Sequence, residues 1–174
     1  MFSYLSPGQR VRPDHPLRAI RRLTDEARAT LSPRFAAMYS AIGRPSSPAE
    51  QLLRAWLLQA LSTVRRERLL MEEIDDRVLC RWFVGLGIDD AIWSPTTFSK
   101  NRERLLASDV AAAFFDAVVT QARTAGLLSD EPFTVDSTRR TLRHRGGARV
   151  DWTVPFAAAA HNLVRRRILG AASW

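Results

Sequence analysis

The chain has 174 residues, 46% of them hydrophobic and 25% charged, which suits one ordinary globular domain or two small ones. Its single cysteine, Cys80, cannot form a disulfide within the chain, which excludes a disulfide-stabilised fold and indicates a reducing compartment. No stretch has the apolar length of a signal peptide or a membrane span, so we expect a cytoplasmic protein with no membrane partner.

The charge is distributed unevenly along the chain. The formal net charge is +8, yet residues 1–136 carry 18 basic and 17 acidic side chains, a balance of +1. Residues 137–174 carry eight arginines against Asp151 alone, a balance of +7. The excess indicates an anionic partner, and its abrupt onset after Asp136 suggests that two pieces of different origin meet there.

The first 130 residues are predicted to be helical. Residues 25–43 favour two short helices separated at Ser32 and Pro33. Ser47 then fits an N-cap, with Pro48 at the first helical position and Glu50 completing a capping box. Apolar residues repeat every fourth position after that and predict a wide buried stripe: Leu52, Trp56, Ala60 and Val64, flanked by Leu53, Leu57 and Leu61.

Residues 67–87 predict two more short helices, with a break near Asp75 and Asp76. The second helix should end at the glycine pair Gly85 and Gly87, which suits a C-cap. Cys80 lies in its apolar part and is interpreted as a small core residue. A final long helix is expected from Ser108 or Asp109 to Gly126, with apolar residues inward: Val110, Phe114, Ala117 and Val118.

Between these segments, residues 94–106 combine a helix start with basic side chains. Ser94 fits an N-cap before Pro95, and Phe98, Leu105 and Leu106 are expected to face inward. Thr97, Lys100 and Arg104 follow the spacing i, i+3, i+7 and should share another face.

Two interpretations of this basic face stay open. A helix and a turn containing glycine and proline precede it, and Arg102 adds a third cation, which is compatible with a helix-turn-helix whose second helix enters the major groove. Thr96 and Thr97, near the helix start, would then meet phosphates. The alternative is a solvated face held by ion pairs to Glu103.

Residues 133–136 are β-prone and form the one convincing strand of the sequence. Asp136 ends this strand and precedes Ser137 and Thr138, as ribonuclease-H-like folds present the first ligand of a divalent-metal pair. The alternative is that Asp136 caps a turn.

A tail helix is expected at about 155–169. Its three consecutive arginines, 165–167, span roughly 200° of the helix circumference and cannot share one face. The three histidines are scattered, with no zinc-type spacing.

The stretch "SPAEQLLRAWLLQALSTV", continuing through "SPTTFSKNRERLL", resembles the helical N-terminal domain of bacterial insertion-sequence transposases of the InsH type, the insertion-sequence-five group. "LLSDEPFTVDST" is similar to the segment that follows, in which the family has Val-Asp-Gly-Thr. Asp136 then matches the first residue of the Asp-Asp-Glu triad, and Ser137 replaces the usual glycine. The resemblance covers about residues 47–138 and is weaker before them.

The tail, "TLRHRGGARVDWTVPFAAAAHNLVRRRILGAA", is similar to the opposite end of the same family. The second aspartate, the glutamate and most of the sheet would lie between the two matches, so we infer an internal deletion that joins the chain near Thr138 to Thr141. The implied domains are an N-terminal helical extension (1–46), the InsH-type helical domain (47–128), the first catalytic strand (129–138) and a basic remnant (139–174). The expected fold is mainly α, with a helix-turn-helix-like segment and a fragment of a ribonuclease-H-like α/β domain.

Complete members of the resembled family use magnesium to cut and join DNA at terminal inverted repeats. Here Asp151 is the only carboxylate side chain after Asp136, and it matches no catalytic position. The resemblance therefore implies an inactive remnant without a cofactor, in which Asp136 is a vestigial catalytic and metal-binding residue. DNA binding would rest on Thr97, Lys100 and Arg104, with Arg143 and Arg145 from the tail, and would associate the protein with the nucleoid.

Two alternatives remain. The chain is a helical interaction module that forms oligomers, or that associates with full-length transposase and inhibits it. Otherwise it is an unstable product that does not fold.

Overall fold

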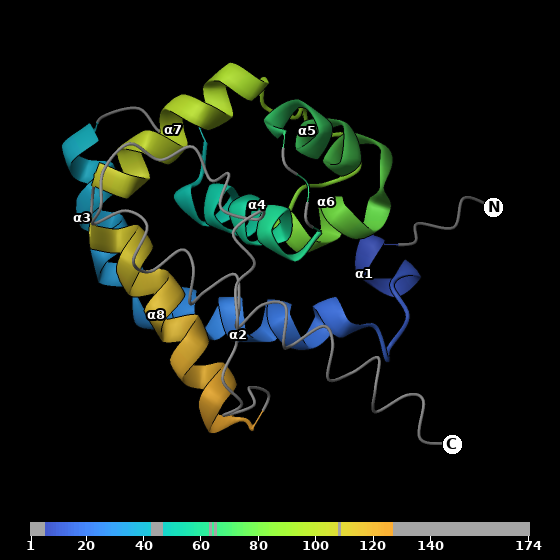
Figure 1. The fold of residues 1–174 in the computed structure, drawn as a ribbon, viewed down its shortest axis with the longest axis horizontal. Coiled ribbons are helices and arrows are strands. Elements are labelled where there is room, and N and C mark those ends of the chain that lie inside the picture. Colours follow the sequence, from blue (N-terminus) through green and yellow to red (C-terminus); the bar gives the residue numbers. More distant parts are fainter. Residues whose placement is uncertain (1–5, 43–46, 63, 65, 108, 127–174) are drawn as a thin grey trace, which may run out of the picture.

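The computed structural model describes residues 6–42, 47–62, 64, 66–107 and 109–126. Within these ranges all regular secondary structure is α-helical (Figure 1). The helices are α1 (Pro7–Arg10), α2 (Pro16–Thr30), α3 (Ser32–Ile42), α4 (Ala49–Leu61), α5 (Glu67–Asp76), α6 (Val78–Val84), α7 (Pro95–Ala107) and α8 (Asp109–Thr124). The predicted strand at 133–136 and the tail helix at 155–169 lie outside the described residues.

The helices expected within the described residues are confirmed, with small shifts at their ends. The break between α5 and α6 falls at Arg77, next to the predicted pair of aspartates. α2 ends at Thr30, with Leu31 as its C-cap one residue before the predicted separation. α1 and the start of α2 were not predicted from the sequence. α2 begins at Pro16, and the His15 side chain caps it by accepting a hydrogen bond from the backbone N–H of Leu17 at 3.2 Å.

The capping box predicted at Ser47 is wrong. Pro48 itself is the N-cap of α4, and its carbonyl accepts hydrogen bonds from the backbone N–H groups of Gln51 and Leu52 at 3.1 and 3.2 Å. Because α4 starts one residue later than the sequence suggests, Ser47 lies outside the capping position. Its hydroxyl oxygen is buried and has no hydrogen-bond partner among the residues that the structure describes.

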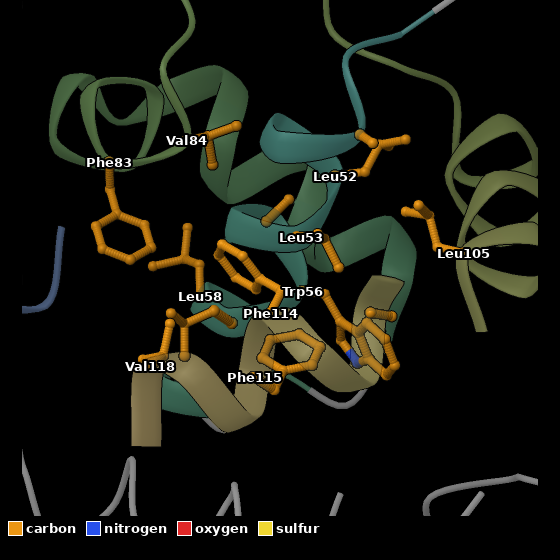
Figure 2. Packing of buried hydrophobic residues seen from close by; sticks show 14 of the residues in the cluster. Leu52, Leu53, Trp56, Leu58, Phe83, Val84, Leu105, Phe114, Phe115 and Val118 are labelled. Carbon is orange, nitrogen blue, oxygen red and sulfur yellow. The ribbon is translucent and has the colours of Figure 1, made fainter. Parts of the chain in front are cut away.

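α4 lies at the centre of the fold and is covered on nearly all sides (Figure 1). Figure 2 shows its Leu53, Trp56 and Leu58 meeting Phe83 and Val84 of α6, Leu105 of α7, and Phe114, Phe115 and Val118 of α8. The rings of Trp56 and Phe115 meet edge to face, with centroids 5.1 Å apart. The first half of the predicted stripe is buried, and the burial there is wider than a stripe, since every residue from 52 to 58 is buried. The second half is only partly buried: Ala60 and Leu61 are half-buried, and Val64, also half-buried, lies beyond the end of α4.

The helices before residue 47 belong to the same core. Ile20, Leu23 and Ala27 of α2 are buried within it, and α2 packs against α6 and α8. Arg21 donates a hydrogen bond to the backbone carbonyl of Trp82, and its guanidinium carbon lies 4.5 Å from the centroid of the Trp82 ring. These contacts tie the N-terminal helices to the end of α6.

A buried arginine connects α4 to α2. Arg54, in the middle of α4, forms an ion pair with Asp25, which also lies 3.9 Å from Arg21. Burial lowers the pKa of Arg54 and of Arg21, and the nearby Asp25 carboxylate partly offsets this effect in both. Arg54 and Arg21 therefore hold α2 against α4 and α6.

Gly85 is required at the end of α6, as the sequence predicts. Its φ is +94°, its N–H donates to the carbonyls of Arg81 and Trp82, and a Cβ placed there would lie 3.0 Å from Nη1 of Arg54. We expect Gly85→Ala to lower the free energy of unfolding by about 2 kcal/mol, since the left-handed conformation alone costs about 1 kcal/mol. Urea titration followed by circular dichroism measures this change.

Gly126 supplies the matched control. It also has a positive φ, +64°, but nothing lies within 4 Å of a Cβ placed there. Gly126→Ala should therefore lower the free energy of unfolding only by the cost of placing alanine in the left-handed conformation. Equal losses at the two positions would contradict a steric role for Arg54.

Candidate nucleic-acid interface

α7 begins as predicted. The backbone N–H of Thr97 donates to the hydroxyl oxygen of Ser94 at 3.1 Å, and the two hydroxyl groups are 2.9 Å apart. The backbone carbonyl of Ser94 accepts the first helical hydrogen bond, from Phe98, at 3.0 Å. Ser94 is therefore the N-cap that the sequence indicates, and it fixes the point at which α7 starts.

One side of α7 is anchored in the core. The Phe98 side chain is 0% exposed and its ring stacks on Trp93, with centroids 6.3 Å apart. Leu105 is also buried, so both are inward-facing as predicted; the Leu106 side chain lies outside the described residues. α7 packs against α4, α5 and α8, which together set its orientation.

Arg102 belongs to the anchored side and not to the basic face. Its Nη1 lies 2.5 Å from Oε1 of Glu67 on α5, and Ser99 donates to the same oxygen at 3.5 Å. Only 17% of the Arg102 side chain is exposed. Of the three basic residues considered along this helix, Arg102 is thus used to join α7 to α5.

The opposite side of α7 presents an exposed row. Thr96, Lys100 and Arg104 are exposed and lie four residues apart, so they follow one another along the helix. Thr97 is half-buried, and its hydroxyl group is already engaged with Ser94. The exposed threonine of this face is therefore Thr96, and Thr97 contributes to the start of the helix.

The ion-pair interpretation of this face gains no support from the geometry. Glu103 is exposed beside Lys100 and Arg104. Among the residues that the structure describes, none of the three takes part in an ion pair. Two cations are therefore presented to solvent on a helix whose other side is fixed.

The link before α7 differs from a compact helix-turn-helix. Residues 85–94 separate α6 from α7, whereas the motif joins its helices by three or four residues. Arg81 holds this link: it is 5% exposed and donates to the carbonyls of Gly87, at 3.0 Å, and Asp90. Its third partner is Asp75 Oδ1, at 2.9 Å. The orientation of α7 thus depends on an anchored loop.

The remaining predicted site residues, Asp136, Arg143 and Arg145, lie outside the described residues. Within the ranges that the structure describes, no group of three or more histidine, cysteine, aspartate or glutamate side chains could hold a metal ion. In the same ranges no single helix is long and apolar enough to cross a membrane; α7 and α8 reach that length only together, across an 86° bend.

Cys80 is buried in α6, which confirms its interpretation as a core residue. Burial raises the pKa of its thiol, Glu73 raises it further, and Arg77 opposes this. The stabilising effect of the neutral buried thiol is complete below the unfolded-state pKa and is lost as the pH rises through the higher folded-state pKa.

We therefore expect the denaturation midpoint of the wild-type chain to fall between about pH 8 and about pH 10. The fall should be smaller in Cys80→Ala, because the thiol no longer titrates. Urea titrations of both chains at the two pH values test this, and identical pH dependence would contradict it.

The family model described as "Transposase domain (DUF772)" matches residues 5–104. This range contains α1 to α6 and most of α7, and it includes Thr97, Lys100 and Arg104. Searches among curated proteins and among solved structures returned no match.

Proposed function

Because this chain belongs to the DUF772 transposase domain family, for which DNA is the expected partner, we propose that it binds DNA through the exposed side of α7. The observation that carries the proposal is the row of Thr96, Lys100 and Arg104. Both cations lack an ion-pair partner among the described residues, and the helix beneath them is fixed by Phe98 and Leu105.

The row of Thr96, Lys100 and Arg104 has the side chains needed to contact the phosphates of a DNA backbone. Cations that neutralise phosphates release condensed counterions, which supplies most of the sequence-independent affinity. Thr96 lies in the first turn of α7, where its exposed hydroxyl group can donate to a phosphate oxygen. The specific target would be the terminal inverted repeats of an insertion element, and Arg143 and Arg145 would add phosphate contacts from the tail.

The proposed activity stops at binding. Two catalytic magnesium ions need several carboxylate oxygens, and after Asp136 this chain carries Asp151 as its one further carboxylate side chain. These residues do not fit a two-metal site, and we derive no strand-transfer step for the chain. Asp136 keeps the family's first triad position as a vestige.

The InsH-type assignment and the internal deletion are part of the same proposal. They are supported by the resemblance of residues 47–138 and 141–172 to the two ends of that family, and by the change from a balance of +1 to +7 after Asp136. An intact sibling gene containing the missing middle would establish the deletion. A locus without inverted repeats or siblings would contradict it.

Binding can be measured by fluorescence anisotropy with labelled DNA duplexes. We expect the full chain to bind the inverted repeat that flanks its open reading frame at least about tenfold more tightly than a random duplex at matched salt, with log affinity falling linearly with log salt. Equal affinities would overturn the specific target. The absence of salt-dependent binding to either duplex would overturn the proposed function.

A further inference from the structure

The outward side of α5 forms a groove, here called the α5 groove. It is lined by Val64, Arg66, Leu69, Glu72, Glu73, Asp76 and Arg77. Leu69 is 48% exposed and, with Ile88, is one of two large hydrophobic side chains exposed among the described residues. Glu72 pairs with Arg68 at 3.0 Å and Glu73 with Arg77 at 2.8 Å, within the same helix or at its end, whereas no ion pair in the described chain involves Asp76.

The lining of the groove carries three carboxylates, Glu72, Glu73 and Asp76, against two arginines, Arg66 and Arg77, and it lies at the acidic part of an otherwise basic body. Residues 67–90 carry seven acidic and three basic side chains, a balance of −4. The rest of residues 1–126 carries 15 basic and seven acidic side chains, a balance of +8. The Arg68–Glu72 pair is exposed, so it is weak and its arginine is readily exchanged for another cation; in the second pair Arg77 is exposed and Glu73 is half-buried. Complementarity therefore favours a cationic occupant with apolar side chains.

The chain itself contains such a segment, in the part that the structure does not describe. Residues 163–169 read Leu-Val-Arg-Arg-Arg-Ile-Leu, so three guanidinium groups are flanked by two apolar pairs. The DNA-binding proposal does not use them. Thirty-six residues, 127–162, connect Gly126 to Leu163, and at about 3.3 Å per extended residue they span more than the distance needed to reach any face of the domain.

We propose that the α5 groove binds residues 163–169 of the same chain. The apolar side chains of the segment cover Leu69, and its arginines pair with Glu72 and Asp76. The tether favours this occupant, because a linked segment is present at an effective concentration on the order of millimolar. The inference does not depend on DNA binding.

Disulfide formation in the full chain tests this pairing. In the variant Leu69→Cys with Ile168→Cys, the intramolecular disulfide should form at least about tenfold faster than in the control Ala29→Cys with Ile168→Cys. Ala29 is exposed on α2, which lies across the molecule from α5 in Figure 1. Cys80 is common to both variants and buried. Raising the salt to about 1 M should slow the reaction of the first variant only.

A charge exchange gives the second readout. Glu72→Lys with Asp76→Lys should remove the rate advantage, and adding Arg165→Glu, Arg166→Glu and Arg167→Glu should restore it; circular dichroism checks that each variant is folded. Equal rates in the two cysteine pairs would overturn the proposal. Disulfides formed between two chains in place of one would also overturn it and would identify a second copy as the occupant.

Discussion

Phe98→Ala is expected to lower the free energy of unfolding by about 3–5 kcal/mol, the range for truncating a fully buried phenylalanine. The ring is 0% exposed, and it is the main apolar anchor of α7 near its start, where it stacks on Trp93. Because the total free energy of unfolding of a small domain is only about 5–15 kcal/mol, this loss should shift the urea midpoint strongly. Far-UV circular dichroism and tryptophan fluorescence should report the same transition.

Thr96→Ala is the matched control for this change, since Thr96 lies two residues away on the exposed side of the same helix. It should alter the free energy of unfolding by no more than about 0.5 kcal/mol. A loss below about 1 kcal/mol for Phe98→Ala would mean that α7 is not held by this contact. The fixed orientation on which the DNA-binding proposal relies would then be wrong.

Arg81→Met is expected to cost about 3 kcal/mol, because the guanidinium makes three polar contacts that methionine cannot replace. The carbonyls of Gly87 and Asp90 would lose a charged donor, while Asp75, which is exposed, would return to water at little cost. The link at residues 85–94 would lose its anchor. Hydrogen exchange should therefore accelerate at the amides of this link as well as globally.

The substitution Arg77→Met is the control for Arg81→Met, because it removes the same charge from an exposed position. Arg77 is exposed and pairs with Glu73 in an i, i+4 arrangement, which is worth about 0.3–0.5 kcal/mol. Arg81→Met should thus lower the urea midpoint several-fold more than Arg77→Met does. Similar losses would contradict the anchoring role of Arg81.

The sequence predicts most of the helices because their ends carry local signals. Ser94, Pro95 and Gly85 act through the backbone of their own helix, and the structure has them in the expected places. Ser47 shows the limit of such signals. It precedes a proline and an apolar run as a cap would, but α4 starts one residue later and leaves its hydroxyl unsatisfied.

The roles of the arginines could not be read from the sequence. Arg102 lies in the same basic run as Lys100 and Arg104, yet it faces α5 and pairs with Glu67. Arg54 and Arg81 sit in apolar helices, and nothing local shows that they are buried and paired with Asp25 and Asp75. These contacts join residues on different helices, so only the packed structure separates structural arginines from those available to a ligand.

The capping histidine of α2 was missed for a related reason. Ser, Thr, Asp and Asn are the usual N-caps, and a histidine gives a weak signal before Pro16. Near this start, Arg18 and Arg21 lie over the Trp82 ring of α6, and such a contact between distant residues is invisible in a local pattern. The part of the candidate site after residue 126, including Asp136, stays a prediction from the sequence alone.

The most direct test of the DNA-binding face is a charge-reversal comparison. Lys100→Glu with Arg104→Glu should reduce affinity for the inverted-repeat duplex by more than tenfold and lower the slope of log affinity against log salt by about two. Arg22→Glu with Arg28→Glu makes the same change in net charge on exposed positions of α2. The proposed face predicts a large loss in the α7 variant and a small one in the α2 variant. Equal losses would show that net charge alone governs binding, and an unaffected α7 variant would contradict the proposed face.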